Sequence, residues 1–378
     1  MKVTISRESL LAGLTLARAV APKKEGISAD IVNLSADMDS FYVQACDLET
    51  SVMYTAPSSG VDVVSGGSLV LPVALTYDLV VNARKGQEIE ITSQETNAQF
   101  RFGKRGRVVV YGQSPDVFPD LPEFQPKGCF SISREDLSEL IEKSIFAGTS
   151  DESKYDLDNV YVKARSNSVS FIATDGKRLA ICTKQTPTPK KKQEAVVPRS
   201  GLRQVAKLVK IANIEEDEAV EVAVVGNHFV FNTEHITLAV GTVTSQFPPY
   251  EKLLNSVWGP EARIDANDLI SPLKQIAALS GKAMDRFAEF TFSSPPAGKL
   301  QLSSTNSRGK AEYEMQAAMG DMVPLPVKFD PDLLLPALAF AEDKFVWRWT
   351  TDANGPSLME IGSDFRYIVL PIKTDDGV

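Results

Sequence analysis

Histidine and cysteine are scarce in this sequence, which has two His and three Cys among 378 residues. A Ser-His-Asp relay or a His-rich metal site would have to use His228 or His235. The cysteines, Cys46, Cys129 and Cys182, are odd in number and widely spaced, which predicts neither a disulfide framework nor a metal site. So few cysteines favour a reducing compartment, and we expect a cytoplasmic protein.

Long apolar runs, targeting signals and nucleotide-binding motifs are missing as well. The first residues carry no apolar stretch with a small-residue cleavage site, so we expect no signal peptide. The best apolar run, residues 333–338, is far shorter than the roughly 18 residues of a membrane span and contains a proline. Neither a Walker-type phosphate loop nor a Gly-x-Gly-x-x-Gly motif after a strand is present. We therefore expect no membrane partner, no cofactor, no metal and no catalytic centre.

Acidic residues outnumber basic ones by 49 to 40, which gives a formal net charge of −9. Taken alone, this charge argues against a chain that coats itself in nucleic acid. The basic residues are segregated, however. In a predicted helix at 202–212, Arg203, Lys207 and Lys210 stand on one side with no acid among them, and the other side is apolar. A basic interior inside an acidic exterior would reconcile the net charge with phosphate binding.

One third of the length is 126 residues, and sequence markers recur at about this interval. Three different markers return in constant order at offsets between 126 and 132. Such regularity indicates three copies of one unit. The recurring segments are 5–10, 132–137 and 264–269; 71–73, 197–199 and 325–327; and 118–121 and 247–250.

Each copy predicts two strand-to-helix transitions. In the first copy, a strand at 3–5 leads into a helix at 7–19, and a strand at 68–71 leads into a helix at 74–81. Polar residues stand where helix N-caps belong. These residues are Ser6, Ser133 and Asp265.

Alternating strands follow the helices, at 88–91, 220–224 and 290–292. Each copy is thus predicted to lay two helices on one face of a mostly antiparallel sheet, which is an α+β fold. Pro and Gly near 125–128 and 257–261 indicate the boundaries. The predicted domains are 1–126, 127–258 and 259–378.

Two aspartates leave an enzymatic alternative open. Asp47 and Asp175 occupy equivalent places in the first two copies, and Asn306 stands at that place in the third. A metal-dependent nucleic-acid enzyme could use the two carboxylates. No His-rich cluster supports a metal there.

Residues 173–180, Ala-Thr-Asp-Gly-Lys-Arg-Leu-Ala, resemble the signature of the bacterial DNA polymerase III beta subunit, the sliding clamp, usually Ala-Thr-Asp-Gly-His-Arg-Leu-Ala. Residues 367–373, Tyr-Ile-Val-Leu-Pro-Ile-Lys, resemble that family's Tyr-Val-Val-Met-Pro-Met-Arg ending. Segments 196–199 and 247–250 match as well, and the resemblance runs from Met1 to Lys373.

The resemblance implies a homodimeric ring of three clamp domains per chain, with helices lining the hole and sheets forming the outer wall. Such a ring encircles double-stranded DNA without reading its sequence and catalyses nothing itself. It would tether DNA polymerase and the clamp loader through short linear peptides. A clamp-fold scaffold for repair or phage replication factors is the alternative.

The family's functional positions can be carried over residue by residue. The implied DNA-binding residues are Lys23, Lys24, Lys154, Tyr155, Arg199, Arg203, Lys207 and Lys210. The implied peptide pocket comprises Leu157, Thr174, Gly176, Lys177, Arg178, Leu179, Pro248, Lys252, Leu253, Ile368, Val369, Leu370, Pro371 and Ile372.

Two lysines at the pocket, Lys177 and Lys252, predict a preference for peptides with acidic flanks. The tail 374–378 extends past the family's usual end. For ring closure, the resemblance places basic and apolar residues of the first domain opposite acidic and apolar residues of the partner's third domain. The implied interface residues are Arg105, Arg107, Val108, Val110, Leu279, Glu312 and Glu314.

Overall fold

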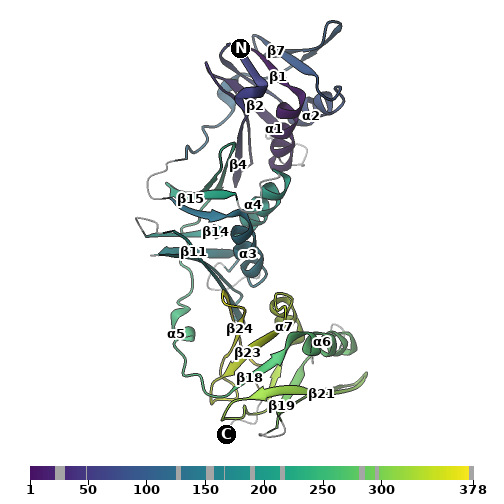
Figure 1. The fold of residues 1–378 in the computed structure, drawn as a ribbon, viewed down its shortest axis with the longest axis vertical. Coiled ribbons are helices and arrows are strands. Elements are labelled where there is room, and N and C mark those ends of the chain that lie inside the picture. Colours follow the sequence, from purple (N-terminus) through teal and green to yellow (C-terminus); the bar gives the residue numbers. More distant parts are fainter. Residues whose placement is uncertain are drawn as a thin grey trace. The chain divides into compact units, whose positions relative to one another are not determined.

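The computed structural model describes residues 1–21, 30–47, 49–124, 129–149, 157–165, 167–187, 192–212, 218–280, 286–293 and 298–373. The chain forms two compact units (Figure 1). Unit 1 comprises Met1–Ser138, Ala164–Asn167 and Thr186–Thr244, and unit 2 comprises Glu139–Lys163, Ser168–Gln185 and Ser245–Val378. The domain boundaries expected after residues 126 and 258 remain a prediction.

Unit 1 contains two antiparallel sheets. The first has the order β5-β1-β7-β8-β9, and the second has the order β10-β15-β16-β17-β4-β3-β2-β6. The strands of the first sheet are β1 (Lys2–Ser6), β5 (Val61–Ser65), β7 (Glu88–Gln94), β8 (Asn97–Phe102) and β9 (Gly106–Val110). Those of the second are β2 (Ile31–Ala36), β3 (Phe41–Cys46), β4 (Thr50–Thr55), β6 (Gly67–Pro72), β10 (Phe130–Ser133), β15 (Ala219–Val225), β16 (His228–Asn232) and β17 (Ile236–Gly241).

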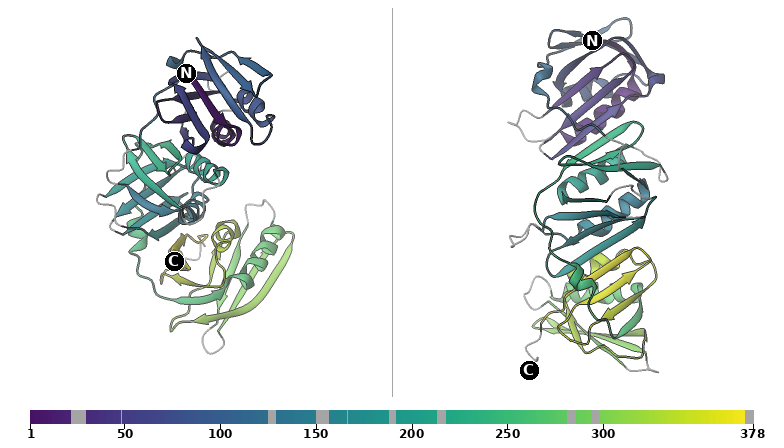
Figure 2. Two further views of the ribbon diagram at one scale, coloured as in Figure 1. Left: turned by 45° about the horizontal axis from the view of Figure 1, so that its top comes forward. Right: turned by 90° about the vertical axis from the view of Figure 1, so that its left-hand side faces the viewer.

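Three longer helices of unit 1 cover these sheets, as the two views of Figure 2 show. Helix α1 packs against α2 and against strands β3 and β4, and α4 contacts both α1 and β17. The buried side chains of α1 recur at helical spacing, for example Leu10, Leu14 and Ala17. The helices are α1 (Arg7–Val20), α2 (Val73–Val81) and α4 (Arg199–Ile211).

In unit 2, ten strands follow one another in the order β12-β13-β25-β24-β23-β18-β21-β20-β19-β22. Trp347 and Tyr367 are fully buried in it. Its strands are β12 (Ser168–Thr174), β13 (Arg178–Gln185), β18 (Glu261–Asp265), β19 (Ala288–Phe292), β20 (Lys299–Asn306), β21 (Gly309–Met319), β22 (Val327–Phe329), β23 (Lys344–Trp349), β24 (Ser357–Ile361) and β25 (Phe365–Val369). Its helices are α5 (Glu251–Leu254), α6 (Ala266–Ser280) and α7 (Pro331–Leu338).

Helix α3 (Arg134–Ile145) and strand β11 (Asn159–Arg165) each have residues in both units, whereas strand β14 (Gln193–Pro198) lies in unit 1. Two short 3-10 turns, at Ser58–Gly60 and Pro115–Val117, also lie in unit 1.

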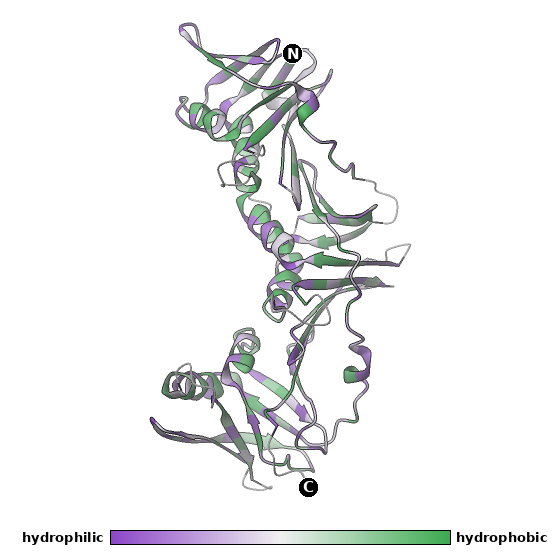
Figure 3. Ribbon diagram, turned by 180° about the vertical axis from the view of Figure 1, so that it is seen from behind, coloured by the Kyte–Doolittle hydropathy of each residue, from purple (hydrophilic) through white to green (hydrophobic). Residues whose placement is uncertain are grey.

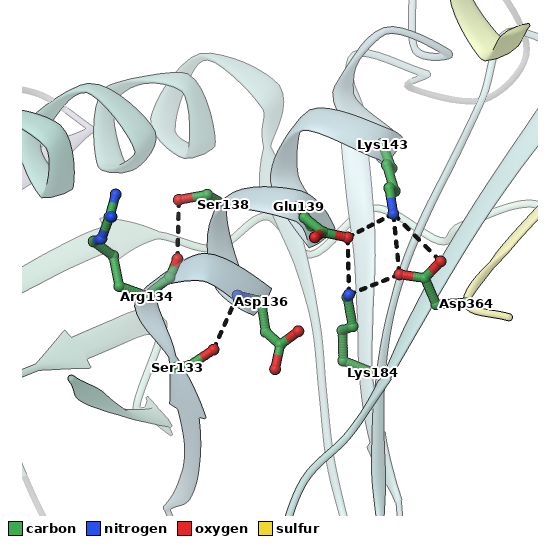
Figure 4. A network of polar contacts seen from close by, with 8 residues as sticks. All are labelled: Ser133, Arg134, Asp136, Ser138, Glu139, Lys143, Lys184 and Asp364. Atoms are coloured by element: carbon green, nitrogen blue, oxygen red, sulfur yellow. Dashed lines mark hydrogen bonds and ion pairs between the residues drawn. The ribbon is translucent and has the colours of Figure 1, made fainter. Parts of the chain in front are cut away.

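The helix starts confirm the three predicted N-caps. Ser6 Oγ accepts a hydrogen bond from Ser9 N at 3.1 Å. Ser133 Oγ accepts from Asp136 N at 3.0 Å (Figure 4). Asp265 Oδ1 accepts from Asn267 N at 3.0 Å. The predicted α+β fold is therefore confirmed at the level of its repeated strand-to-helix transitions.

The repeat also fixes three equivalent hairpin turns. Asp47 Oδ1 accepts from Glu49 N and Thr50 N, at 2.8 and 2.6 Å, between β3 and β4. Asp175 Oδ1 accepts from Lys177 N and Arg178 N, at 2.9 and 3.0 Å, between β12 and β13. Asn306 Oδ1 accepts from Arg308 N at 2.8 Å between β20 and β21. The residue three positions after each turn residue begins the next strand.

The strand that begins after each of the first two turns also pairs with a strand from a distant part of the sequence. We call these two equivalent pairings the first and the second seam. In the first seam, β4 pairs with β17 from Thr50↔Val240 to Tyr54↔Ile236. In the second seam, β13 pairs with β25 from Arg178↔Val369 to Cys182↔Phe365. The first seam lies wholly in unit 1 and the second wholly in unit 2.

Candidate functional site

Helix α4 has the predicted basic face. Arg203, Lys207 and Lys210 are exposed, while Leu202 and Val205 on the opposite side are fully buried. Hydrophilic and hydrophobic residues accordingly alternate around the helix (Figure 3). Three cations on one exposed face, with no carboxylate in the helix, form a surface suited to contact with phosphates.

The other predicted DNA-binding residues are placed less fully. Arg199 begins α4 and is half-buried. Lys23, Lys24, Lys154 and Tyr155 lie outside the described residues, as does the tail 374–378.

The second seam carries an apolar cluster on one face. Leu179 pairs with Ile368 across the seam, and Ile172 pairs with Ile181 on the neighbouring strands. Tyr250 from the chain segment before α5 packs on the same cluster. The complete cluster comprises Ile172, Leu179, Ile181, Tyr250, Leu358 and Ile368, with Tyr161, Phe247, Leu253, Leu254 and Trp258 packed partly buried against it.

The turn that opens the second seam is held by its own side chains. Asp175 Oδ2 accepts from Arg178 Nε at 2.9 Å, and Thr174 Oγ1 donates to Arg178 O at 2.6 Å. Gly176 has a φ of +87°, a backbone conformation that residues other than glycine rarely adopt. Beyond the turn, Leu370 N donates to Lys177 O at 2.8 Å and extends the ladder past β25. The signature segment therefore shapes the rim of the apolar cluster.

The structure brings most of the predicted pocket residues to this rim. Leu370 and Ile372 stay 36% and 39% exposed, although both are apolar. Lys177 and Lys252 are exposed. Leu157, Thr174, Leu179, Ile368, Val369 and Pro371 are buried, Arg178, Pro248 and Leu253 are half-buried, and Gly176 is exposed.

Sequence reasoning missed part of the cluster. Phe247 and Tyr250 belong to a repeat marker, which was a usable signal, and Phe247 stacks on Tyr161 with ring centroids 5.4 Å apart. Ile172 and Ile181 gave no such signal, because they become neighbours only through the register of β12 and β13.

The equivalent face of the first seam is polar. Ser51 stands opposite Ala239 where Leu179 stands opposite Ile368. Asn33 Nδ2 donates to Gln44 Oε1 at 2.8 Å where the second seam has aromatic and aliphatic side chains. An apolar cluster is thus built on one of two equivalent seams.

Comparison with known proteins bears on this arrangement. Residues 131–249 match the family model described as DNA polymerase III beta subunit, central domain. The chain is 25% identical to the beta sliding clamp of Synechocystis sp., with 99% of each covered, and 24% identical to that of Pseudomonas aeruginosa, with 99% of this chain and 100% of the relative covered.

Solved structures agree over the whole length. The DNA polymerase III subunit beta from Pseudomonas aeruginosa superposes with a TM-score of 0.87 at 24% identity, covering 99% of this chain and 100% of that one. The DNA polymerase sliding clamp from Bacillus subtilis superposes with a TM-score of 0.86 at 19% identity, covering 99% of each. The central part of the chain thus matches the DNA polymerase III beta subunit family, and its whole length is similar to beta sliding clamps. The predicted class of function, a DNA sliding clamp without catalytic activity, is confirmed with it.

For a beta subunit, the two repeated aspartates have a structural role. Asp47 and Asp175 each close a hairpin by accepting backbone N–H groups, and Asn306 does the same in the third copy. An amide can replace a carboxylate in such a turn but not as a strong metal ligand. Within the part of the chain that the structure describes, no group of three or more His, Cys, Asp or Glu could hold a metal ion. None of the described helices is long and apolar enough to cross a membrane.

Two strand edges stay open among the described residues. Strand β9 pairs only with β8. Strand β21 pairs with β20 from Gly309 to Gln316, but with β18 only from Ala317 to Met319. Both edges bear the predicted interface charges.

The predicted interface residues differ in exposure. Arg105 and Arg107 on one edge and Glu312 and Glu314 on the other are exposed. Val110, by contrast, is buried in its own chain. Lys310 pairs with Glu312 at 2.7 Å, and Lys299 pairs with Glu314 at 2.6 Å. The hydrogen bond and charge of Lys299 lower the pKa of Glu314 below its usual value.

A cleft of about 730 Å³ opens beside β9. Leu79, Phe102 and Val108 give it apolar walls, and Arg84 and Arg105 add cations. The other predicted interface residue, Leu279, is half-buried near the end of α6, close to Gly309.

Proposed function

We propose that two copies of this chain close into a ring around duplex DNA and hold polymerase and clamp-loader peptides at the second seam. The ring consists of three domains per chain, 1–126, 127–258 and 259–378, and works in the cytoplasm. The proposal rests on the number of equivalent strand pairings that the chain can form. Two are closed within the chain, and the strands that would form a third both end as open edges.

The register of the internal seams transfers to the third. Thr50, Arg178 and Gly309 follow the three equivalent turns, and the first two pair with Val240 and Val369. The last pair before the turn is Phe102↔Gly106 in the β8–β9 hairpin and Ile361↔Phe365 in the β24–β25 hairpin. Gly106 is therefore equivalent to Phe365, and Val110, four residues later, is equivalent to Val369. Gly309 then pairs with Val110 of the partner subunit.

This register sets opposite charges against each other. Counting along both strands from Gly309 and Val110, Glu312 stands opposite Arg107 of the partner subunit and Glu314 opposite Arg105 of the partner subunit. Opposed charges on paired strands stabilise one register and destabilise its neighbours. The cleft beside β9 gives apolar Leu279 a place to pack.

The DNA contact assigned to α4 needs no base recognition. Arg203, Lys207 and Lys210 attract phosphates through a salt-screened force, and the closed ring prevents dissociation. A net charge of −9 leaves the rest of the surface unattractive to DNA. Weak contact and topological retention together permit sliding.

The peptide assignment rests on the apolar face of the second seam. Leu179 with exposed Leu370 and Ile372 offers sites for aliphatic or aromatic anchor residues. Exposed Lys177 and Lys252 favour acidic residues beside the anchors. The polar face of the first seam offers no such anchor site.

The decisive test is retention on DNA of different topology. The chain is loaded by a bacterial clamp loader onto a nicked circle and onto the same molecule after linearisation. We expect stable retention on the circle and rapid loss from the linear ends. Equal retention on both would contradict ring closure.

A triple variant, Arg203→Gln, Lys207→Gln and Lys210→Gln, sharpens the same assay. We expect the triple variant to stay on the circle once it is loaded. Its apparent DNA affinity should depend less steeply on salt concentration, because each of about three lost phosphate contacts removes about 0.9 from the slope of log affinity against log salt. A matched change on the acidic helix α3, Glu135→Gln, should leave the slope unchanged. If the slope of the triple variant also stays unchanged, α4 does not face DNA.

A further inference from the structure

Four charged side chains meet on the helix-facing side of the second seam (Figure 4). This charge cluster consists of Glu139 and Lys143 on α3, Lys184 on β13 and Asp364 in the turn before β25. Lys143 Nζ lies 2.5 Å from Glu139 Oε2 and 3.1 Å from Asp364 Oδ2. Lys184 Nζ lies 2.8 Å from Glu139 Oε2 and 2.7 Å from Asp364 Oδ2. Each cation thus contacts both acids.

The cluster is partly shielded from water. The side chains of Lys143, Lys184 and Asp364 are 14%, 16% and 16% exposed. Asp364 also accepts a hydrogen bond from Thr183 N at its backbone oxygen, at 2.8 Å. The turn before β25 is therefore tied to β13 by its backbone and to α3 and β13 by its side chain.

The equivalent positions of the first seam hold neither lysine nor carboxylate. Its equivalent positions are Ala12 and Leu16 on α1, Ala56 after β4, and His235 before β17. The backbone bond is the same, because Thr55 N donates to His235 O at 2.8 Å. Leu16 and Ala56 are 2% and 5% exposed. Apolar contacts are therefore sufficient to hold such a seam together.

Stability alone does not account for the charges of the second seam. Partly buried ion pairs lose hydration, and apolar replacements of similar size are often as stable or more so. What charged groups add is direction, since each hydrogen bond fixes a distance and an angle. Here that direction is applied to Asp364, which lies in the turn before β25, four residues before Ile368.

We propose that the charge cluster positions β25 against β13 and so holds the two walls of the peptide pocket in place. Asp364 and its partners are positioning residues, because they act through the seam. This inference rests on the proposed peptide-binding function. The five residue pairs of the second seam lie between the charge cluster and the rim of the apolar cluster, and Leu179↔Ile368 is one of these pairs. A contact that fixes one end of the seam therefore also fixes the position of these two side chains.

The test compares Asp364→Asn with the unchanged full-length chain. An uncharged peptide with apolar anchors serves as the probe, so that salt and the lysines of the rim have no direct effect on its affinity. We expect about fivefold weaker binding, the lower end of typical coupling between sites. Raising the salt concentration should weaken binding to the unchanged chain but not to the variant, since the variant has lost the charge that salt would screen.

Hydrogen exchange gives a second reading at both ends of the seam. In Asp364→Asn, we expect faster exchange at Thr183 N and at Leu370 N, and no change at Thr55 N in the first seam. Lys184→Arg keeps the charge and should bind within twofold of the unchanged chain. Glu135→Gln removes an exposed carboxylate from the same helix and is the matched control. The fluorescence of buried Trp347 and Trp349 reports whether each variant is folded.

The outcomes separate the two proposals. If the unchanged chain binds no peptide, the proposed function fails and this inference fails with it. If the unchanged chain binds and a folded Asp364→Asn binds equally well at every salt concentration, only the positioning role is overturned. Faster exchange at Thr183 N alone, with normal affinity, overturns it as well.

Discussion

The two internal seams have the same backbone and opposite side chains. Each seam consists of five residue pairs and begins after an equivalent Asp turn. In each, one more backbone hydrogen bond joins the first strand to the residue just before the second strand. The first seam is polar on the face where the second is apolar. It is apolar on the helix side, where the second is charged. The backbone therefore determines where a seam lies, and the side chains determine what the seam binds.

The third pairing extends this comparison. Its positions equivalent to Leu179 and Ile181 are Lys310 and Glu312, which are exposed and paired with each other at 2.7 Å. Charged residues there suit an interface that joins two copies, and they do not form an apolar pocket. One repeated unit can thus carry an apolar, a polar or a charged surface at the same place.

The largest effect should come from removing the apolar face that distinguishes the second seam. Leu179→Ala with Leu370→Ala should weaken peptide binding at least about 30-fold, because each truncated anchor contact is worth about 1–2 kcal/mol. Fluorescence anisotropy with a labelled peptide measures this.

The matched control changes the first seam instead. Ser51→Ala with Met53→Ala should alter affinity less than twofold, and both double variants should remain dimers. Similar losses in the two variants would remove the functional distinction between the seams.

The local parts of this architecture were predictable from the sequence, and the long-range parts were not. Ser6, Ser133 and Asp265 act on backbone groups two or three residues away, so their N-cap role was visible in the sequence. The signature at 173–180 located the rim of the apolar cluster because it forms one turn. Ile172 and Tyr161 join the cluster only through strand register.

The charge cluster illustrates the same limit. Lys143 and Asp364 are 221 residues apart in the chain and gave no pattern in the sequence. The basic face of α4, by contrast, was predictable, because Arg203, Lys207 and Lys210 recur at helical spacing within one segment.

The second largest effect concerns the third seam. Arg107→Glu should weaken the dimer about tenfold or more, because like charges then stand opposite each other on paired strands. Adding Glu312→Arg should restore much of the affinity if the transferred register is right. Sedimentation equilibrium measures both. Failure of the second change to restore the dimer would show that Arg107 and Glu312 do not face each other.

A smaller effect is expected from pH, and its sign follows from the charge cluster. Burial opposes the charge of Asp364, but hydrogen bonds from Lys184 and Lys143 outweigh burial and lower the pKa of this carboxyl. Burial also opposes the charge of Lys143, yet hydrogen bonds to Glu139 and Asp364 raise its pKa. A lowered acid pKa gives stabilisation that is complete above the unfolded value and disappears as pH falls through the folded value.

The affinity for an uncharged peptide should therefore stay flat from about pH 5 to 9 and fall severalfold below about pH 4. For Lys143 the stabilisation is complete below the unfolded pKa and disappears as pH rises through the folded one. Isothermal titration at several pH values tests this. A transition between pH 6 and 8 would point to a histidine in place of the cluster.

The smallest effect uses one cysteine in the second seam and one beside the first as reporters. Burial raises the pKa of Cys182 on β13 to about 12, and the charge of Asp364 contributes to the rise. At pH 8 about one thiol in ten thousand is then ionised, so alkylation should be slow. Cys46 on β3, which pairs with β4 of the first seam, also has a raised pKa, from burial and the charge of Asp47.

Asp364→Asn should speed alkylation of Cys182 severalfold, because it removes a charge that raises the pKa of this thiol and because it loosens the second seam, and it should leave Cys46 unchanged. Mass spectrometry of alkylated peptides measures both rates in one sample. Equal acceleration at both cysteines would mean that the variant loosens the whole chain, whereas acceleration at Cys182 alone confines the effect to the seam that carries the charges. Because the backbone pairing is the same in both seams, such a result would attribute the difference to the four side chains of the cluster.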